Sequence, residues 1–271
     1  ELPYVRALAD YGCGKSRFLR TIGSVCYKPM FTAGATSISP IFRIIDTFKG
    51  TFVLDEADIR FSDTKSEIVK ILNSGFSRGT PVMRSEENKG RGFDVKTFDV
   101  YCPKIVATRE RFYDKALESR FLIEELDSSN LRDDIPINLP DSFEEEATQI
   151  RNKLLMWRFN NYGPKIIDAS QIDKSLEPRL NQIILPLMSI INDLELKERL
   201  RAFIKSHNVQ LIQDRGFTPE ADVLEAIMKI INLNYLEITM KHIADVVNAE
   251  LGEKEKHITA KKVGILVRER L

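Results

Sequence analysis

A short glycine-containing loop near the start of the chain has the residue types that bind phosphate. Its centre consists of Gly12, Cys13, Gly14, Lys15 and Ser16 in direct succession. In such a loop the glycines let backbone N–H groups turn toward an anion, Lys15 reaches the outer phosphates, and the Ser16 hydroxyl is placed to bind Mg²⁺. The full phosphate-loop pattern begins with glycine, whereas this loop begins with Ala9. The loop predicts a site for a nucleoside triphosphate; the alternative is a common glycine turn before a lysine-containing helix.

A second stretch supplies the acids that phosphate chemistry needs. Segment 51–58 is an apolar run ending in acidic residues, which is typical of a buried parallel strand with carboxylates at its carboxyl end. That edge is where α/β sheets bind ligands. Asp55 would hold Mg²⁺ near Ser16, and Glu56 would orient or deprotonate an attacking water. The alternative is a strand that ends in a solvated acidic turn.

The surrounding apolar patterns predict the elements that would position these residues. An apolar run at 4–8 predicts a strand before the loop. After the loop, apolar residues recur at helical spacing, at Phe18, Leu19, Ile22 and Val25. Further strands and helices are expected at 27–31, 41–48, 64–76 and 104–108. We therefore expect an α/β core with a parallel sheet, of the P-loop NTPase class, over residues 1–126.

A hairpin insertion is expected within this core. Segments 81–85 and 93–101 have the pattern of two paired strands, and the residues between them include glycines that permit a turn. Lys89 and Arg91 would lie at its tip. These two residues are candidates for nucleic-acid contact, and the alternative is a solvated charged loop.

Beyond residue 126 the pattern becomes helical. We expect a helical lid over 127–216, in which Pro186 kinks one helix. Residues 217–271 predict three short helices, and the last of them contains Lys261 and Lys262. These features fit a helix-turn-helix of the winged type that binds DNA, with its wing beyond the last residue. The alternative is a helical cap that docks on protein and has a solvated basic face.

Composition limits the partners and the compartment. The chain has 271 residues with 40 basic and 40 acidic side chains, so any nucleic-acid contact must come from local patches. Its three cysteines have no metal-ligand spacing, which suggests a reducing compartment. We find no apolar run near twenty residues and no signal peptide, so we expect a cytoplasmic protein without membrane contact. Because the chain begins without methionine, directly in a predicted strand, we expect a piece of a longer protein.

Taken together, these segments resemble an AAA+ ATPase over essentially the whole chain. The resemblance rests on the phosphate loop, the acid strand, Thr108 at a strand end, and the pair Ser119-Arg120. Segments 39–46 and 71–79, with the hairpin that follows, look like the DNA helicase or replication-initiator ATPases of viruses, plasmids and integrated mobile elements. The resemblance implies ATP and Mg²⁺ as ligands.

The resemblance also implies roles for three further residues. Thr108 matches the first sensor, which positions the lytic water or the γ-phosphate, although many relatives have Asn there. Arg120 looks like the arginine finger that acts on the nucleotide of a neighbouring subunit, and Arg179 is similar to the second sensor. A finger that acts on a neighbour implies a ring, most often a hexamer, and the hairpin would grip single-stranded DNA in its channel.

Three functions are therefore open at the level of sequence. The first is an ATP-driven DNA motor. The second is an ATP-dependent assembly switch that remodels a site without translocating. The third is a domain that binds nucleotide only structurally, which Ala9 in the loop keeps open.

Overall fold

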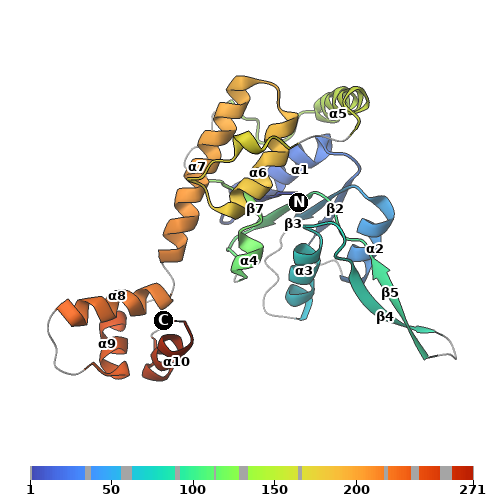
Figure 1. The fold of residues 1–271 in the computed structure, drawn as a ribbon. Helices are drawn as coiled ribbons and strands as arrows, with labels where there is room; N and C mark the ends of the chain where they lie inside the picture. Colours follow the sequence, from blue (N-terminus) through green and yellow to red (C-terminus); the bar gives the residue numbers. More distant parts are fainter. Residues whose placement is uncertain are drawn as a thin grey trace. The chain divides into compact units, whose positions relative to one another are not determined.

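The structure is a computed structural model, and it divides the chain into two compact units, Glu1–Ile204 and Lys205–Leu271 (Figure 1). The residues that it describes are 2–33, 38–55, 63–88, 92–112, 114–127, 134–163, 167–216, 219–232, 238–250 and 258–270. The division falls inside one long helix, α7 (Leu194–Gly216). The boundaries expected at 126/127 and 216/217 stay predictions.

A parallel sheet forms the centre of the first unit. Within the described residues it has five strands in the order β2-β3-β6-β1-β7, and each pairing is parallel. The strands are β1 (Tyr4–Leu8), β2 (Pro29–Ala33), β3 (Thr51–Asp55), β6 (Lys104–Thr108) and β7 (Phe121–Glu125). The α/β class and the parallel sheet are confirmed. The prediction for β2 was two residues early, because Lys28 has a φ of 44° and belongs to the turn before the strand.

Helices cover both faces of this sheet. Helix α1 (Lys15–Val25) packs on one face, where the buried cluster contains Ala7, Leu19, Val53, Ile105 and Ala107. Alternate residues of a strand face opposite sides. Accordingly, Tyr4 and Arg6 contact helices of the other face, where the Tyr4 hydroxyl donates to the Leu72 carbonyl at 2.7 Å and Arg6 pairs with Glu118. The helices that they contact are α3 (Asp63–Ser74) and α4 (Lys115–Glu118), and α2 (Ile38–Phe48) packs against α3.

A hairpin follows α3 and precedes β6 in the chain, and it projects from the first unit (Figure 1). Its antiparallel strands are β4 (Val82–Asn88) and β5 (Gly92–Phe98). The prediction of a turn over 86–92 was wrong in extent, because cross-strand pairing continues as far as Asn88 and Gly92. The expected tip residues, Lys89 and Arg91, lie outside the described residues.

The base of the hairpin is attached to the unit by a buried lysine at the start of β6. The ammonium group of Lys104 donates to the carbonyls of Gly75 at 3.2 Å, Val100 at 2.8 Å and Cys102 at 3.2 Å. Burial lowers its pKa to about 8. A Cβ on Gly75 would lie 2.3 Å from this ammonium, so the close approach requires glycine there. The lysine thus fixes the segment that leaves the hairpin against the end of α3.

Between β7 and the end of α7, the described part of the chain forms α5 (Phe143–Asn160), the 3₁₀ turn η2 (Ala169–Gln171), α6 (Pro178–Ile190) and α7 itself. Helix α5 contacts α1, where Arg151 donates to the Ser24 carbonyl at 2.8 Å. Pro186 lies inside α6, as expected. The apolar face of α5 is partly exposed to solvent, since Ile150, Leu154 and Trp157 are each more than two-fifths exposed.

The second unit has a helical core of its own. Its described part after α7 contains α8 (Pro219–Asn232), α9 (Met240–Glu250) and α10 (Ala260–Arg270). Small and branched side chains fill the space between them, including Val223, Ile230, Ile243, Val247 and Val263. Asn248 accepts from the backbone N–H of Ile258 at 2.7 Å and donates to its carbonyl at 2.9 Å, which fixes the chain just before α10.

Candidate functional site

The glycine loop lies between the carboxyl end of β1 and the start of α1. Gly12 and Gly14 have φ angles of 75° and 80°, a region that strains residues with a Cβ. Gly14 also caps α1, and no side chain caps the helix there. The first N–H groups of a helix lack partners within the helix and attract anions. The loop therefore has the backbone geometry that an anion site requires.

The lysine of the loop folds back across it. The Lys15 ammonium donates to the carbonyls of Ala9 at 2.8 Å and Asp10 at 2.6 Å. This position holds a positive charge over the loop, between the end of β1 and the start of α1. Such a charge is suited to the oxygens of a phosphate group.

A cavity of about 450 Å³ adjoins the loop. Its lining includes Ser16 and Asp55, so the two residues predicted to hold Mg²⁺ border the same space. Other parts of the wall come from α1, β2 and β3, including Leu19, Arg20, Phe31, Thr32 and Val53. No group of three or more His, Cys, Asp or Glu suited to a metal occurs among the described residues. Mg²⁺ does not need one, because it is commonly bound by one or two carboxylates together with substrate phosphates and water.

Thr108 lies beside the loop at the end of β6. Its carbonyl accepts from the Ala9 N–H at 3.2 Å, and it is paired in register with Leu8. The side chain is only 1% exposed, and its Oγ1 has no hydrogen-bond partner among the described residues. Buried hydroxyl groups normally have a partner, and one without a partner indicates a functional constraint or a missing ligand. Since β6 lies between β1 and β3, Thr108 comes between the loop and Asp55 along this edge.

The two predicted arginines lie at the opposite edge of the sheet. Arg120 immediately precedes β7 and donates to the Asn73 carbonyl at 2.9 Å. Its guanidinium lies 5.1 Å from the Phe76 ring centroid, and that of Arg179 lies 5.4 Å from the same centroid. Phe76 packs against Tyr4 at the start of β1. A strand of this length spans roughly 16 Å, so neither arginine joins the loop within one chain.

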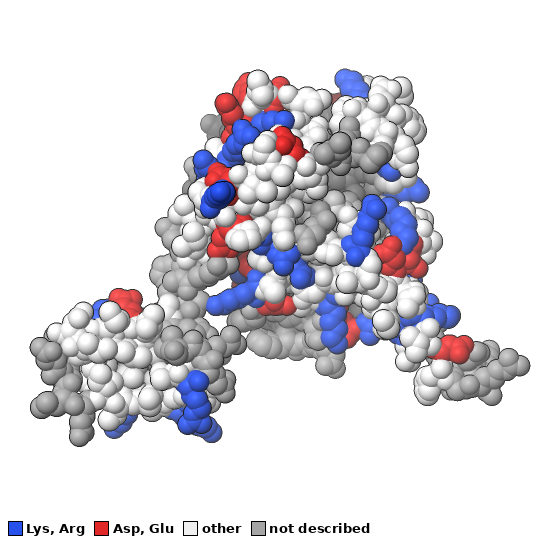
Figure 2. Space-filling view, in the orientation of Figure 1, with Lys and Arg blue, Asp and Glu red and all other residues white. Residues whose placement is uncertain are grey.

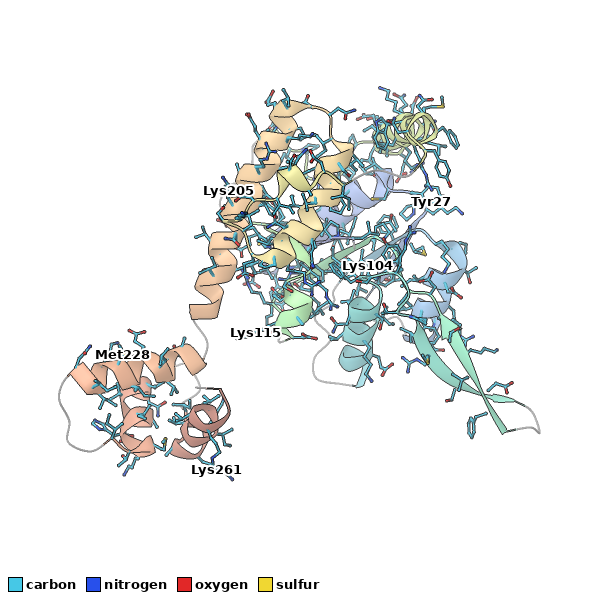
Figure 3. All side chains as sticks on the ribbon, viewed as in Figure 1. Tyr27, Lys104, Lys115, Lys205, Met228 and Lys261 are labelled. Atoms are coloured by element: carbon cyan, nitrogen blue, oxygen red, sulfur yellow. The ribbon has the colours of Figure 1, made fainter. Side chains whose placement is uncertain are left out.

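Other predicted residues fall into two groups. Glu56, like Lys89 and Arg91, lies outside the described residues. Lys261, which Figure 3 labels, and Lys262 are both exposed in the first turn of α10. In the first unit, acidic and basic side chains are interspersed over the visible face (Figure 2).

One contact at the loop was missed by sequence reasoning. The Arg109 guanidinium lies 4.3 Å from the ring centroid of Tyr11 and donates to the Tyr11 hydroxyl. Arg109 directly follows Thr108, whereas Tyr11 belongs to the loop. The only signal in the sequence is an arginine directly after a predicted strand, which is too common to identify a site. The contact links the end of β6 to the loop.

The fold and the geometry define an α/β protein with a parallel sheet and a glycine–lysine loop at the carboxyl end of β1. No protein-family model matches the chain, and a search of the curated proteins finds no match. No helix in the described part of the chain has the length and apolar character needed to cross a membrane.

Proposed function

We propose that this chain is an ATP-hydrolysing ring motor that acts on DNA, of the AAA+ type carried by viruses, plasmids and mobile elements. The observation that carries the proposal is that Lys15, Ser16, Asp55 and Thr108 lie at the same edge of the sheet. Among the described residues the Thr108 hydroxyl has no hydrogen-bond partner. A phosphate-bearing substrate in the adjoining cavity would supply an anion for Lys15, and Thr108 lies buried directly beside the loop. The strand order supports it as well, because it brings three strand ends with different polar groups together.

The proposed reaction is the hydrolysis of the terminal phosphoanhydride bond of ATP. The loop N–H groups and Lys15 bind the phosphates, and Lys15 exchanges its carbonyl partners for phosphate oxygens. Glu56 accepts the proton of the attacking water as the bond between the γ-phosphorus and the bridging oxygen breaks, which yields ADP and phosphate. Bound Mg²⁺, held by Ser16 and Asp55, would neutralise charge on the phosphates. Arg120 of a neighbouring subunit would stabilise the transition state.

The first test is steady-state ATP hydrolysis with and without single-stranded DNA, at protein concentrations that span assembly. We expect stimulation by DNA, its loss in Arg120→Ala, and a decrease in turnover of roughly 10²-fold or more in Glu56→Gln. Arg199→Ala, which removes an exposed arginine of α7, serves as the control. Wild-type turnover in Glu56→Gln, in protein shown to assemble, would rule out this mechanism.

Replacing Thr108 by Val separates a catalytic role from a structural one. Because the hydroxyl is buried without a partner among the described residues, its removal should leave the free energy of unfolding unchanged or raise it by about 1 kcal/mol. If it positions the water or the γ-phosphate, turnover should fall by roughly 10²-fold. Urea unfolding and the hydrolysis assay measure the two effects. A stable variant with normal turnover would remove Thr108 from the proposed site.

A second candidate is an ATP-dependent assembly switch that docks on protein. It is favoured by an exposed apolar stripe on α8, formed by Leu224, Met228 and Ile231, which are 49%, 53% and 51% exposed. The switch predicts that Lys89→Ala combined with Arg91→Ala leaves function intact. The motor predicts loss of DNA-stimulated hydrolysis in the same variant.

A further inference from the structure

A second cavity lies at the edge of the sheet opposite the glycine loop. Its volume is about 600 Å³, and its wall is formed largely by residues that precede strands β1, β2, β3 and β6. It also borders the base of the hairpin, since Arg78 comes before β4 and Tyr101 comes after β5. The strands that separate the two edges span roughly 16 Å. A ligand here is therefore distinct from a nucleotide at the loop.

The wall of this cavity contains two arginine–tyrosine stacks. The Arg158 guanidinium, from α5, lies 4.4 Å from the ring centroid of Tyr27, which Figure 3 labels. The Arg78 guanidinium lies 5.1 Å from the ring centroid of Tyr101. Both arginines are exposed, and neither guanidinium has a hydrogen-bond or ion-pair partner among the described residues. Their N–H donors are thus available while their planes are held against aromatic rings.

The acidic groups near this cavity are already engaged. The Lys49 ammonium donates to Asp46 at 2.8 Å and to Asp99 at 3.0 Å. Although partial burial works against it, hydrogen bonds from the Tyr101 N–H and from Lys49 lower the pKa of the Asp99 carboxyl. Asp99 therefore stays ionised and paired with Lys49. The positive charge of the two arginines remains uncompensated by described residues.

We propose that this cavity binds a nucleotide unit of nucleic acid, with a base stacked on the tyrosine and guanidinium planes and a phosphate bound by the arginines. Bases of single strands stack on aromatic side chains and on the planes of guanidinium groups. A guanidinium group can also bind a phosphate through two parallel hydrogen bonds. The volume exceeds what a single ring needs and lies in the usual range for small-ligand sites. The excess of basic over acidic side chains in the wall favours an anionic ligand over a metal cation.

The position suggests how such a site would serve the hairpin. The carbonyls of Val100 and Cys102, on either side of Tyr101, both accept from Lys104. A strand bound on Tyr101 would therefore contact the same fixed segment that anchors the hairpin. This inference deepens the proposed DNA motor but does not depend on hydrolysis, because binding in the cavity requires no ATP.

The test is binding of fluorescein-labelled oligodeoxythymidine to the full chain without ATP, measured by anisotropy over a range of salt concentrations. We expect Arg78→Ala combined with Arg158→Ala to raise Kd at least about tenfold. The same pair should reduce the slope of log K against log salt by roughly 0.7, the loss of one phosphate contact on a single strand. Arg78→Lys with Arg158→Lys should recover only part of the affinity, because lysine lacks the planar group.

The matched control is Arg199→Ala with Arg201→Ala, which removes the same charge from exposed positions on α7. It should change Kd by less than about twofold, as expected for distant surface charges. Labelled dTMP is a second probe, which distinguishes a free nucleotide from a strand. If the Arg78→Ala/Arg158→Ala variant loses binding of either probe, the site is supported, and the probe that is lost identifies the kind of ligand. The proposed site would be ruled out if the two double alanine variants changed Kd equally, or if the Arg78/Arg158 variant bound as tightly as the wild type.

A photocrosslink gives the location independently. Oligodeoxythymidine that carries 5-iododeoxyuridine should crosslink to Tyr27 or Tyr101, as identified by mass spectrometry. Crosslinks confined to the hairpin tip or to residues 205–271 would contradict the proposal. If hydrolysis proves absent while these crosslinks form, the proposed ATPase fails and the nucleotide site stands.

Discussion

Replacing Lys15 by Ala is expected to raise the Kd for ATP at the loop by at least about tenfold. The ammonium already spans the loop between two carbonyls, so its loss removes a positive charge that is fixed over the expected path of the phosphates. Charge-assisted hydrogen bonds contribute about 1.5–3 kcal/mol each, which corresponds to at least roughly a tenfold rise in Kd and more if two phosphates are contacted. Isothermal titration calorimetry with a non-hydrolysable ATP analogue measures it. Hydrolysis should fall below detection.

Folding should be affected little by the same change. The Asp10 carbonyl belongs to an exposed residue, so water can replace the lysine there. Lys153→Ala on the exposed side of α5 is the control for loss of one positive charge. If Lys15→Ala bound the analogue within twofold of wild type, the loop would be an ordinary glycine turn before a lysine-containing helix.

Features of the core that depend on neighbours in sequence were predictable. A run of apolar residues at 4–8 and another at 104–108 gave strands with those bounds, because burial on both faces leaves a continuous apolar pattern. The glycines of the loop signal backbone conformations that other residues avoid, and Gly12 and Gly14 have them. The order of the strands was not predictable, since it depends on pairings between distant segments.

Features that depend on distant contacts could not be predicted. Arg109 and Tyr11 are separated by 98 positions, and no periodic pattern relates them. The helical pattern beyond residue 126 correctly predicted α5, but it did not indicate how much of the helix face that contains Trp157 is covered. The cavity at the opposite edge combines residues before four different strands, each of which alone has the composition of a solvated turn.

The largest effect on stability is expected at a residue hidden inside an apparently apolar strand. Arg6 of β1 is fully buried, and its guanidinium forms two hydrogen bonds with the Glu118 carboxylate, one of them at 2.8 Å. The same carboxylate accepts from the Phe112 N–H at 3.1 Å. The guanidinium also lies 5.0 Å from the Phe121 ring centroid. This network joins β1 to α4 inside the first unit.

Replacing Arg6 by Met is expected to lower the free energy of unfolding of the first unit by about 3–5 kcal/mol. Methionine fills much of the volume, but the largely buried Glu118 carboxylate then keeps only Arg111, whose guanidinium lies 3.9 Å away, as a cation. This loss of charge compensation dominates the cost. Urea unfolding followed by tryptophan fluorescence measures it, because the sole tryptophan of the chain, Trp157, lies in this unit.

The double variant Arg6→Met with Glu118→Leu separates the pair from its surroundings. A buried ion pair replaced by apolar residues of similar size is often nearly neutral, so the double variant should recover most of the lost stability. If the two single effects simply added, the pair would not be the cause. Because Glu118 lies two residues before Arg120, the single variant Arg6→Met should also displace Arg120, the proposed arginine finger. In the double variant we therefore expect the free energy of unfolding to recover more fully than the DNA-stimulated hydrolysis that depends on Arg120.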